Sequence, residues 1–203
     1  MTHFDTVART WDDPQKRDRA RRVADAIAAA VPGLARMSMF EYGSGTGLLG
    51  LELRSRVGSL TMADSSREMI AVAREKIAAS GATNARAIVL DLTGAAPAAA
   101  SYDLVCTLLT LHHIPDVPAL LRTFHQLLVP GGYVCVSDLD EEDGSFHGAG
   151  FEGHSGFPRG TITSWLEAAG FSDVRISTVA EIDKETAAGR RRFPLFLAIA
   201  RRP

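Results

Sequence analysis

The feature that most constrains what this chain can fold into is a regular alternation between short apolar runs and segments of helical periodicity. The apolar runs cover residues 37–42, 59–63, 87–90, 102–109 and 133–138. Between them lie segments such as 14–31 and 65–81, in which apolar residues recur every three or four positions. Strands that alternate with helices predict βαβ units, and hence a parallel sheet covered by helices on both faces.

Two further strands are expected near the C-terminus, at residues 174–179 and 193–200. A polar, Arg-rich connection joins them and no helix lies between them, so we expect them to pair antiparallel at one end of the sheet. The expected fold class is therefore α/β, with a doubly wound, mostly parallel seven-stranded sheet and an antiparallel last strand. Ligands on such a sheet bind at the carboxyl ends of the strands.

Length and charge narrow the functional classes. With 203 residues, we expect a single domain. The formal net charge of -2 supplies no general positive field, so neither nucleic acid nor an anionic membrane is an expected partner. Both cysteines, Cys106 and Cys135, lie inside apolar runs and are expected to be buried thiols. With no apolar signal segment at the N-terminus, these observations predict a cytoplasmic protein.

A glycine-rich segment, Glu41-Tyr42-Gly43-Ser44-Gly45-Thr46-Gly47, follows the first apolar run. Glycines permit positive φ angles and let a ligand approach backbone N–H groups closely. The spacing differs from the G-x-G-x-x-G of dinucleotide sites, because Leu48 stands where the third glycine would be. A nicotinamide cofactor is therefore disfavoured, and a tight turn without a ligand is the alternative to a binding loop.

Acidic residues end the next two strands. Asp64 could accept hydrogen bonds from both hydroxyls of a ribose, or it could only cap a helix. Asp91 could accept from the exocyclic amine of a base while Leu92 packs on the ring, or it could be an acid in a surface turn. Because three consecutive strand ends carry matching chemistry, we favour a nucleoside site.

Histidines follow the fourth and fifth strands. His112 and His113 come directly after the run 102–109, where a capping or core role is the ordinary alternative to catalysis. The acidic segment 138–143, with His147 and His154 downstream, could ligate a divalent cation. We favour a solvated acidic loop there, and no metal site is expected.

The ordered set of motifs resembles the class I S-adenosylmethionine-dependent methyltransferases. It comprises E-x-G-x-G-x-G, an acid at the second strand end, D-L after the third, D-L-V-x-x-x-x-x-L-H-H-I from Asp103, and L-L-x-P-G-G from Leu127. The similarity is greatest to the small-molecule branch that includes enzymes of ubiquinone and menaquinone biosynthesis. The motifs cover residues 36–140, and the resemblance implies a Rossmann-like fold with S-adenosylmethionine as cofactor.

The resemblance implies roles for individual residues. Glu41, Gly43, Ser44, Gly45 and Gly47 would cradle the methionine part of the cofactor; Asp64, Ser65 and Met69 would hold the ribose and adenosine; Asp91 and Leu92 would frame the adenine; Leu108 and Leu109 would contact the cofactor from the fourth strand. Trp11 replaces the tyrosine of the family's A-x-x-Y-D element, so it would cover the cofactor without a phenolic contact. Residues 1–35 would then form a lid and helix, 36–140 the cofactor-binding core, 139–157 an acidic loop over the substrate pocket, and 158–203 the last helix and strands.

The expected activity is methyl transfer to a small-molecule acceptor, with His113 and then His112 as candidate bases. The segment Leu109-Thr110-Leu111-His112 lacks the N/D-P-P-Y/F motif of enzymes that methylate DNA adenine or glutamine. No acid stands at the fourth strand's end, which opposes the magnesium-dependent catechol type. Two alternatives stay open: a protein that binds S-adenosylmethionine without catalysis, and, less favoured, a nicotinamide-dependent dehydrogenase. The identity of the acceptor and the oligomeric state are left open.

Overall fold

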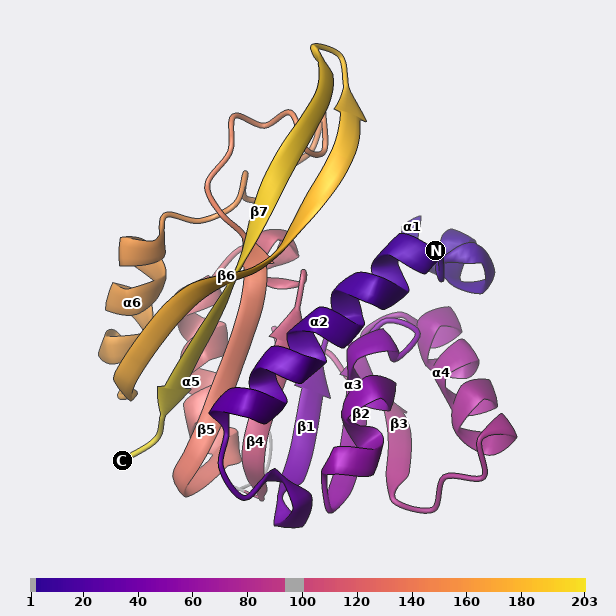
Figure 1. The fold of residues 1–203 in the computed structure, drawn as a ribbon, viewed down its shortest axis with the longest axis vertical. Helices are drawn as coiled ribbons and strands as arrows, with labels where there is room; N and C mark the ends of the chain where they lie inside the picture. Colours follow the sequence, from indigo (N-terminus) through magenta and orange to yellow (C-terminus); the bar gives the residue numbers. More distant parts are fainter. Residues whose placement is uncertain (1–2, 94–100) are drawn as a thin grey trace.

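A single seven-stranded sheet organises the computed structural model, which describes residues 3–93 and 101–203. Its strand order is β3-β2-β1-β4-β5-β7-β6 (Figure 1). The strands are β1 (Ser38–Tyr42), β2 (Ser59–Asp64), β3 (Ala85–Val89), β4 (Tyr102–Leu108), β5 (Leu128–Leu139), β6 (Ser172–Thr186) and β7 (Gly189–Arg201). Strands β1 to β5 are parallel, and β7 is antiparallel to both β5 and β6. The expected fold class is confirmed.

The chain reverses its direction of winding at β1. This strand pairs with β2 on one side and with β4 on the other, in the registers Tyr42↔Ala63 and Glu41↔Cys106. Neighbouring loops therefore leave the sheet in opposite directions between β1 and β4, which is where open α/β sheets bind their ligands.

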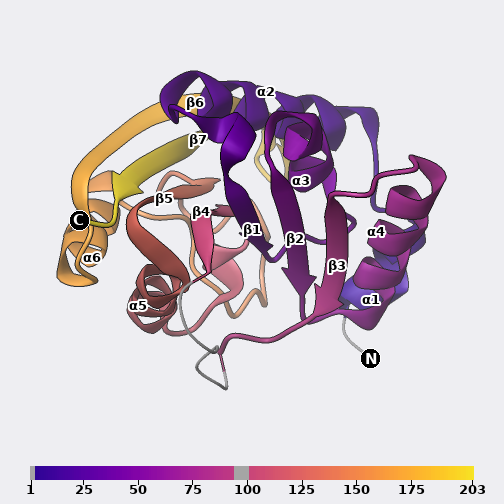
Figure 2. The same cartoon turned by 90° about the horizontal axis from the view of Figure 1, so that it is seen from below.

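Helices cover both faces of the sheet. On one face lie α2 (Pro14–Ala30), α3 (Leu48–Leu53) and α4 (Arg67–Ala79), and on the other α5 (Val117–Leu127) and α6 (Arg159–Ala168) (Figure 2). Two apolar clusters result, one around Ile27, Leu53 and Ile70 and the other around Phe124 and Leu166. None of the described helices combines the length and apolarity needed to cross a bilayer.

Helix α4 begins one residue later than its sequence signal predicts. The pattern Ser65-x-x-Glu68 predicts a capping box, but the capping residue is Ser66, whose hydroxyl accepts from the Met69 N–H at 3.2 Å. Strand β2 continues through Asp64, and the Asp64 carboxylate accepts from the Ser66 N–H at 2.8 Å. The bond between Asp64 and the Ser66 N–H positions Ser66 at the start of the helix, so Ser66 and not Ser65 caps it.

The C-terminal hairpin is longer than the sequence predicts. The arginines that we expected in the connection, Arg190 to Arg192, belong to β7, and the turn lies between Thr186 and Gly189. Cross-strand ion pairs explain the strand conformation of this polar segment, because Arg190 lies 3.1 Å from Asp183. The hairpin consequently extends beyond the body of the sheet (Figure 1).

The sequence Pro130-Gly131-Gly132 is typical of a tight turn, but the segment lies within β5. The register of β5 against β4 shifts between Tyr102 and Leu104. Hydrogen bonds to the residue that follows β7 keep the kinked segment paired: the Gly131 N–H donates to the Arg202 carbonyl, and the Arg202 N–H donates to the Gly132 carbonyl, both at 2.8 Å. As expected, Cys106 and Cys135 are buried free thiols, and they are register partners in β4 and β5.

Candidate functional site

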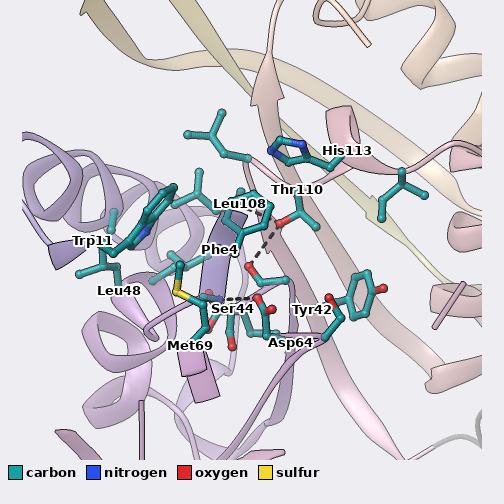
Figure 3. A pocket seen from close by; sticks show the side chains of 18 of the residues that line it. Phe4, Trp11, Tyr42, Ser44, Leu48, Asp64, Met69, Leu108, Thr110 and His113 are labelled. Atoms are coloured by element: carbon teal, nitrogen blue, oxygen red, sulfur yellow. Dashed lines mark hydrogen bonds between the residues drawn. The ribbon is translucent and has the colours of Figure 1, made fainter. Parts of the chain in front are cut away.

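A cavity of about 540 Å³ opens at the carboxyl ends of β1, β2 and β4 (Figure 3). Most of the residues expected at the site line it: Trp11, Glu41, Gly43, Ser44, Gly45, Asp64, Ser65, Met69, Asp91, Leu108, Leu109 and His113. The fold therefore brings together side chains from the N-terminal segment, the glycine loop and the ends of four strands.

Three of the expected site residues do not line the cavity. A Cβ on Gly47 would lie 2.8 Å from the Met62 sulfur, so this glycine serves the packing of α3 on β2. Leu92 is 5% exposed and packs in the apolar core, so its side chain does not line the cavity. His112 is 2% exposed and lies behind His113, because its ring is held by a buried carboxylate.

The two cavity glycines have different roles. Gly43 has a φ of +66°, and a Cβ there would come within 2.3 Å of the Thr110 side chain. Gly45 has a φ of +54°, but its Cβ would meet only the Met69 sulfur at 3.8 Å and the Trp11 Nε1 at 3.9 Å. The chain's own packing therefore fills the space at Gly43, whereas Gly45 presents its backbone to the cavity.

Asp64 lies at the end of β2 and faces the glycine loop. Its Oδ2 accepts from the Gly45 N–H and its Oδ1 from the Ser66 N–H, each at 2.8 Å. Burial raises the pKa of this carboxyl, and the two backbone donors oppose the rise. A carboxylate oxygen can accept more than one hydrogen bond, so both oxygens keep capacity for a ligand hydroxyl.

Glu41 is a buried acid, with 2% of its surface exposed, at the end of β1. Burial raises its pKa to about 8, and the nearby Gly50 N–H opposes this only in part. Its Oε2 has no hydrogen-bond partner among the described residues. A Cβ on Gly50 would lie 2.4 Å from that oxygen, so α3 closes over the acid only because glycine stands there. An unsatisfied buried acceptor beside a cavity is well suited to a cationic ligand group.

Asp91 is fixed by a residue that the sequence did not single out for a role of its own. The Tyr42 hydroxyl donates to Asp91 Oδ1 at 3.4 Å and accepts from the Leu92 N–H at 3.3 Å. The hydroxyl and backbone N–H of Thr93 also donate to Asp91 Oδ1 and lower the pKa of that carboxyl. Burial raises the pKa of Tyr42 to about 12, so it remains a donor over the whole physiological range.

The N-terminal segment covers the cavity. The Phe4 ring lies 5.8 Å from the Trp11 ring and 5.2 Å from the His113 ring. Asp12 ties the segment down, because its carboxylate accepts from the Thr46 hydroxyl and pairs with Lys76. No local pattern distinguishes Phe4 from any other aromatic residue near a terminus, which is why sequence reasoning missed it.

Two cations from α2 also line the cavity and carry no sequence signal. The Lys16 ammonium donates to the Trp11 carbonyl at 2.9 Å and lies over the Trp11 ring. Burial lowers the pKa of Arg19, and in the described part of the chain no carboxylate lies within ion-pair distance of it. Arg19 is thus available to an anionic ligand group.

Backbone strain marks the end of β4. Leu109 has a φ of +52°, which residues other than glycine rarely adopt. Its N–H donates to the Ser137 carbonyl at 2.8 Å, which holds the residue at the cavity wall. His113 follows a short turn later, and its pKa is lowered to about 4, mainly by burial and then by the neighbouring His112 and His147.

The model of the methyltransferase domain family matches residues 15–176. A ubiquinone biosynthesis O-methyltransferase of Xanthomonas axonopodis pv. citri is 34% identical over 155 residues, covering 72% of this chain and 63% of that protein. A methyltransferase of Schizosaccharomyces pombe, described as uncharacterized, is 27% identical over 156 residues, covering 69% and 55%. The chain spans less than two thirds of the length of these curated relatives.

Solved structures agree with the fold. A Haloferax volcanii methyltransferase, solved in complex with the activator Trm112, superposes with a TM-score of 0.81 at 19% identity, over 100% of this chain and 99% of that one. A SAM-dependent methyltransferase of Aquifex aeolicus superposes with a TM-score of 0.71 at 18% identity, over 98% of both chains. The family match covers most of the sequence and the motifs lie in their expected order along the sheet. The chain belongs to the methyltransferase domain family, which confirms the resemblance to S-adenosylmethionine-dependent methyltransferases.

Proposed function

We propose that this chain binds S-adenosylmethionine in the cavity and transfers its methyl group to a small-molecule acceptor. The observation that carries the proposal is the buried Glu41 carboxyl with its unpartnered Oε2 beside the glycine loop. S-adenosylmethionine carries both an ammonium and a sulfonium cation. A cationic ligand group beside this carboxyl would favour its ionised form.

The other lining residues fit the remaining parts of the cofactor. Asp64 has spare acceptor capacity for ribose hydroxyls, and Asp91, fixed by Tyr42, has it for an exocyclic amine. Gly45 offers open space beside its backbone, and Arg19 is free to pair with the cofactor's carboxylate. Charge complementarity at each end would orient the molecule in one direction along the cavity.

The chemistry is an in-line displacement. When bound, S-adenosylmethionine would supply an activated methyl group: an electron pair of the acceptor would form the bond to the methyl carbon, and the electrons of the broken sulfur–methyl bond would stay on sulfur as a neutral thioether. Because the cofactor is already activated, the protein contributes mainly alignment, which can account for about 7–11 kcal/mol of the barrier. Phe4 and Trp11 support this role, since their rings cover the cavity and would exclude water.

Several relatives support a small-molecule acceptor, since they are named as ubiquinone biosynthesis O-methyltransferases. Of the two candidate bases, only His113 lines the cavity, so it is the one that an acceptor bound there would reach. A protein that binds the cofactor without catalysis would share the whole cofactor half of the site. Transfer of a labelled methyl group to any compound of an acceptor panel separates the two functions.

The direct test is calorimetric titration with S-adenosylhomocysteine. We expect Asp64→Ala to weaken binding by about 1.5–3 kcal/mol, the usual scale for hydrogen bonds to a charged group. Asp25→Ala is the matched control, because Asp25 pairs with Arg56 away from the cavity. Equal affinity in the Asp64 variant and the wild type would remove the ribose role, and no binding to the wild type would contradict the proposed function.

A further inference from the structure

Three imidazole rings converge next to the cavity. His112 and His113 lie in the 3-10 turn Leu111–His113 that follows β4, and His147 comes from the segment 140–158. The His147 ring centre lies 5.0 Å from that of His112 and 5.6 Å from that of His113. One ring nitrogen from each residue lies within 4.8 Å of the other two.

His112 is oriented by a buried carboxylate. Asp138, at the end of β5, has no exposed surface, and its Oδ1 lies 2.6 Å from His112 Nδ1. Its Oδ2 accepts from the His112 backbone N–H at 3.3 Å. A carboxylate at Nδ1 favours a proton there and leaves the Nε2 electron pair free, which is how proteins commonly orient a metal-binding histidine.

His147 carries a polar atom with no partner. Its Nε2 is shielded from solvent and makes no hydrogen bond within the described part of the chain. The ring is held by stacking on Phe151, with a centroid distance of 3.7 Å and an interplanar angle of 15°. An imidazole nitrogen that lacks a hydrogen-bond partner is available as a metal ligand.

We propose that His112, His113 and His147 bind a divalent transition-metal ion of the zinc class, with Asp138 as the group that orients His112. Imidazole nitrogen suits zinc, whereas magnesium and calcium prefer oxygen ligands. Three protein ligands leave one position of a tetrahedral site open, and His113 places that position beside the cavity. Zinc–nitrogen bonds of about 2.0–2.1 Å put ligand nitrogens roughly 3.4 Å apart, so nitrogens that lie within 4.8 Å of one another need to approach by at most about 1.4 Å.

The proposed site differs from the expectation of no metal, because the three histidines are far apart in the sequence and come together only in the fold. The acids at the strand ends do not form the ligand set, and His147 lies 34 residues beyond His113 in a segment without periodicity.

The role of the ion rests on the methyl transfer proposed above. The ion would take an oxygen, nitrogen or sulfur atom of the acceptor as its fourth ligand and lower the pKa of that group, so that the acceptor proton leaves to solvent. The freed electron pair then forms the bond to the methyl carbon as the sulfur–methyl bond breaks. Acceptors with a hydroxyl or thiol group are the class that gains most from this assistance.

The test uses the full chain, freed of metal with a chelator and titrated with Zn²⁺ in a calorimeter. We expect one ion per chain for the wild type. His147→Gln should raise the Kd by at least about 100-fold, since loss of a ligand costs more than loss of an orienting partner. His154→Gln is the matched control on the same segment, because the His154 Nε2 lies 2.9 Å from the Ile114 carbonyl oxygen and takes no part in the cluster.

Cobalt substitution gives an independent readout. Co²⁺ in a four-coordinate nitrogen site produces intense visible absorption, which the wild type and His154→Gln should show and His147→Gln should lose. Unchanged Zn²⁺ affinity in His147→Gln, or no stoichiometric binding by the wild type, would overturn the metal site. Titration of the same samples with S-adenosylhomocysteine keeps the two ideas apart, since the wild type and both histidine variants should bind it equally even if the metal proposal is wrong.

Discussion

At the scale of single residues, Glu41 couples proton binding to folding. Its pKa is 4.5 in an unfolded reference and about 8 in the fold, because the carboxyl is buried. Between these two pH values the native protein keeps a proton that the unfolded chain has released. The contribution of Glu41 to stability is therefore complete below pH 4.5 and is lost progressively as the pH rises through 8.

We expect this coupling to disappear in Glu41→Gln. In the cofactor-free protein, stability should fall with rising pH by up to about 1.4 kcal/mol per pH unit more in the wild type than in the variant. Urea unfolding at several pH values between 5 and 8 measures both slopes. Parallel profiles would mean that the Glu41 carboxyl is ionised in the fold.

The part of the cavity lining that could be predicted from the sequence consists of the residues at the strand ends. Asp64 and Gly45 follow apolar runs, so topology alone places them at the same edge of the sheet. Leu92 packs in the core and does not line the cavity, because an apolar residue next to an acid can face either way. Phe4 and Arg19 could not be found at all, since their positions depend on how the N-terminal helices pack across the sheet.

At the scale of elements, the loop between β1 and α3 is the most sensitive part of the cavity. Gly45→Ala should weaken binding of S-adenosylhomocysteine by about tenfold or more, equivalent to about 1.4 kcal/mol, because its Cβ would enter the cavity between Trp11 and Met69. The positive φ also costs stability, on the order of 1–2 kcal/mol.

Gly33→Ala separates these two effects. Gly33 has a φ of +76°, and a Cβ added there would meet nothing within 4 Å, so it carries the backbone strain without the steric block. Calorimetric titration combined with thermal melting should show similar destabilisation in both variants, and weaker binding only in Gly45→Ala. If the two variants bind equally well, the loop is only a turn.

The outer half of the β6–β7 hairpin could not be predicted from local sequence patterns. Periodicity found the inner halves of both strands, because their apolar side chains pack into the core clusters on the two faces of the sheet. The outer halves consist of charged residues that resemble a loop in the sequence, and they become strands only through cross-strand pairs such as Arg192 with Glu181 at 3.4 Å. Pairing between residues 11 positions apart is a long-range property that a local window does not contain.

At the scale of the whole molecule, the hairpin should be stabilised by its apolar base and not by its ion pairs. Phe193 is 2% exposed and packs with Leu195 and Leu139, so Phe193→Ala should cost about 3–5 kcal/mol. Arg190→Ala removes an exposed pair with Asp183 and should change stability by less than about 0.5 kcal/mol. Urea denaturation of both variants measures the difference, and a large effect of Arg190→Ala would contradict this account.

The pairing of β1 with β4 has a consequence for how the molecule acquires its cavity. The register partners Met39 and Leu104 are 65 residues apart in the sequence. The segment between them includes β2, α4 and β3, with the two strands lying on one side of β1 in the sheet. Closing so long a loop costs more conformational entropy than forming a helix or a hairpin, and it is therefore slower. The cavity walls come from both sides of this pair, so we expect a folding chain to gain affinity for the cofactor only after β1 and β4 have paired. Because the cofactor then binds only the chain with a completed sheet, we expect its binding to slow unfolding and to leave the folding rate unchanged.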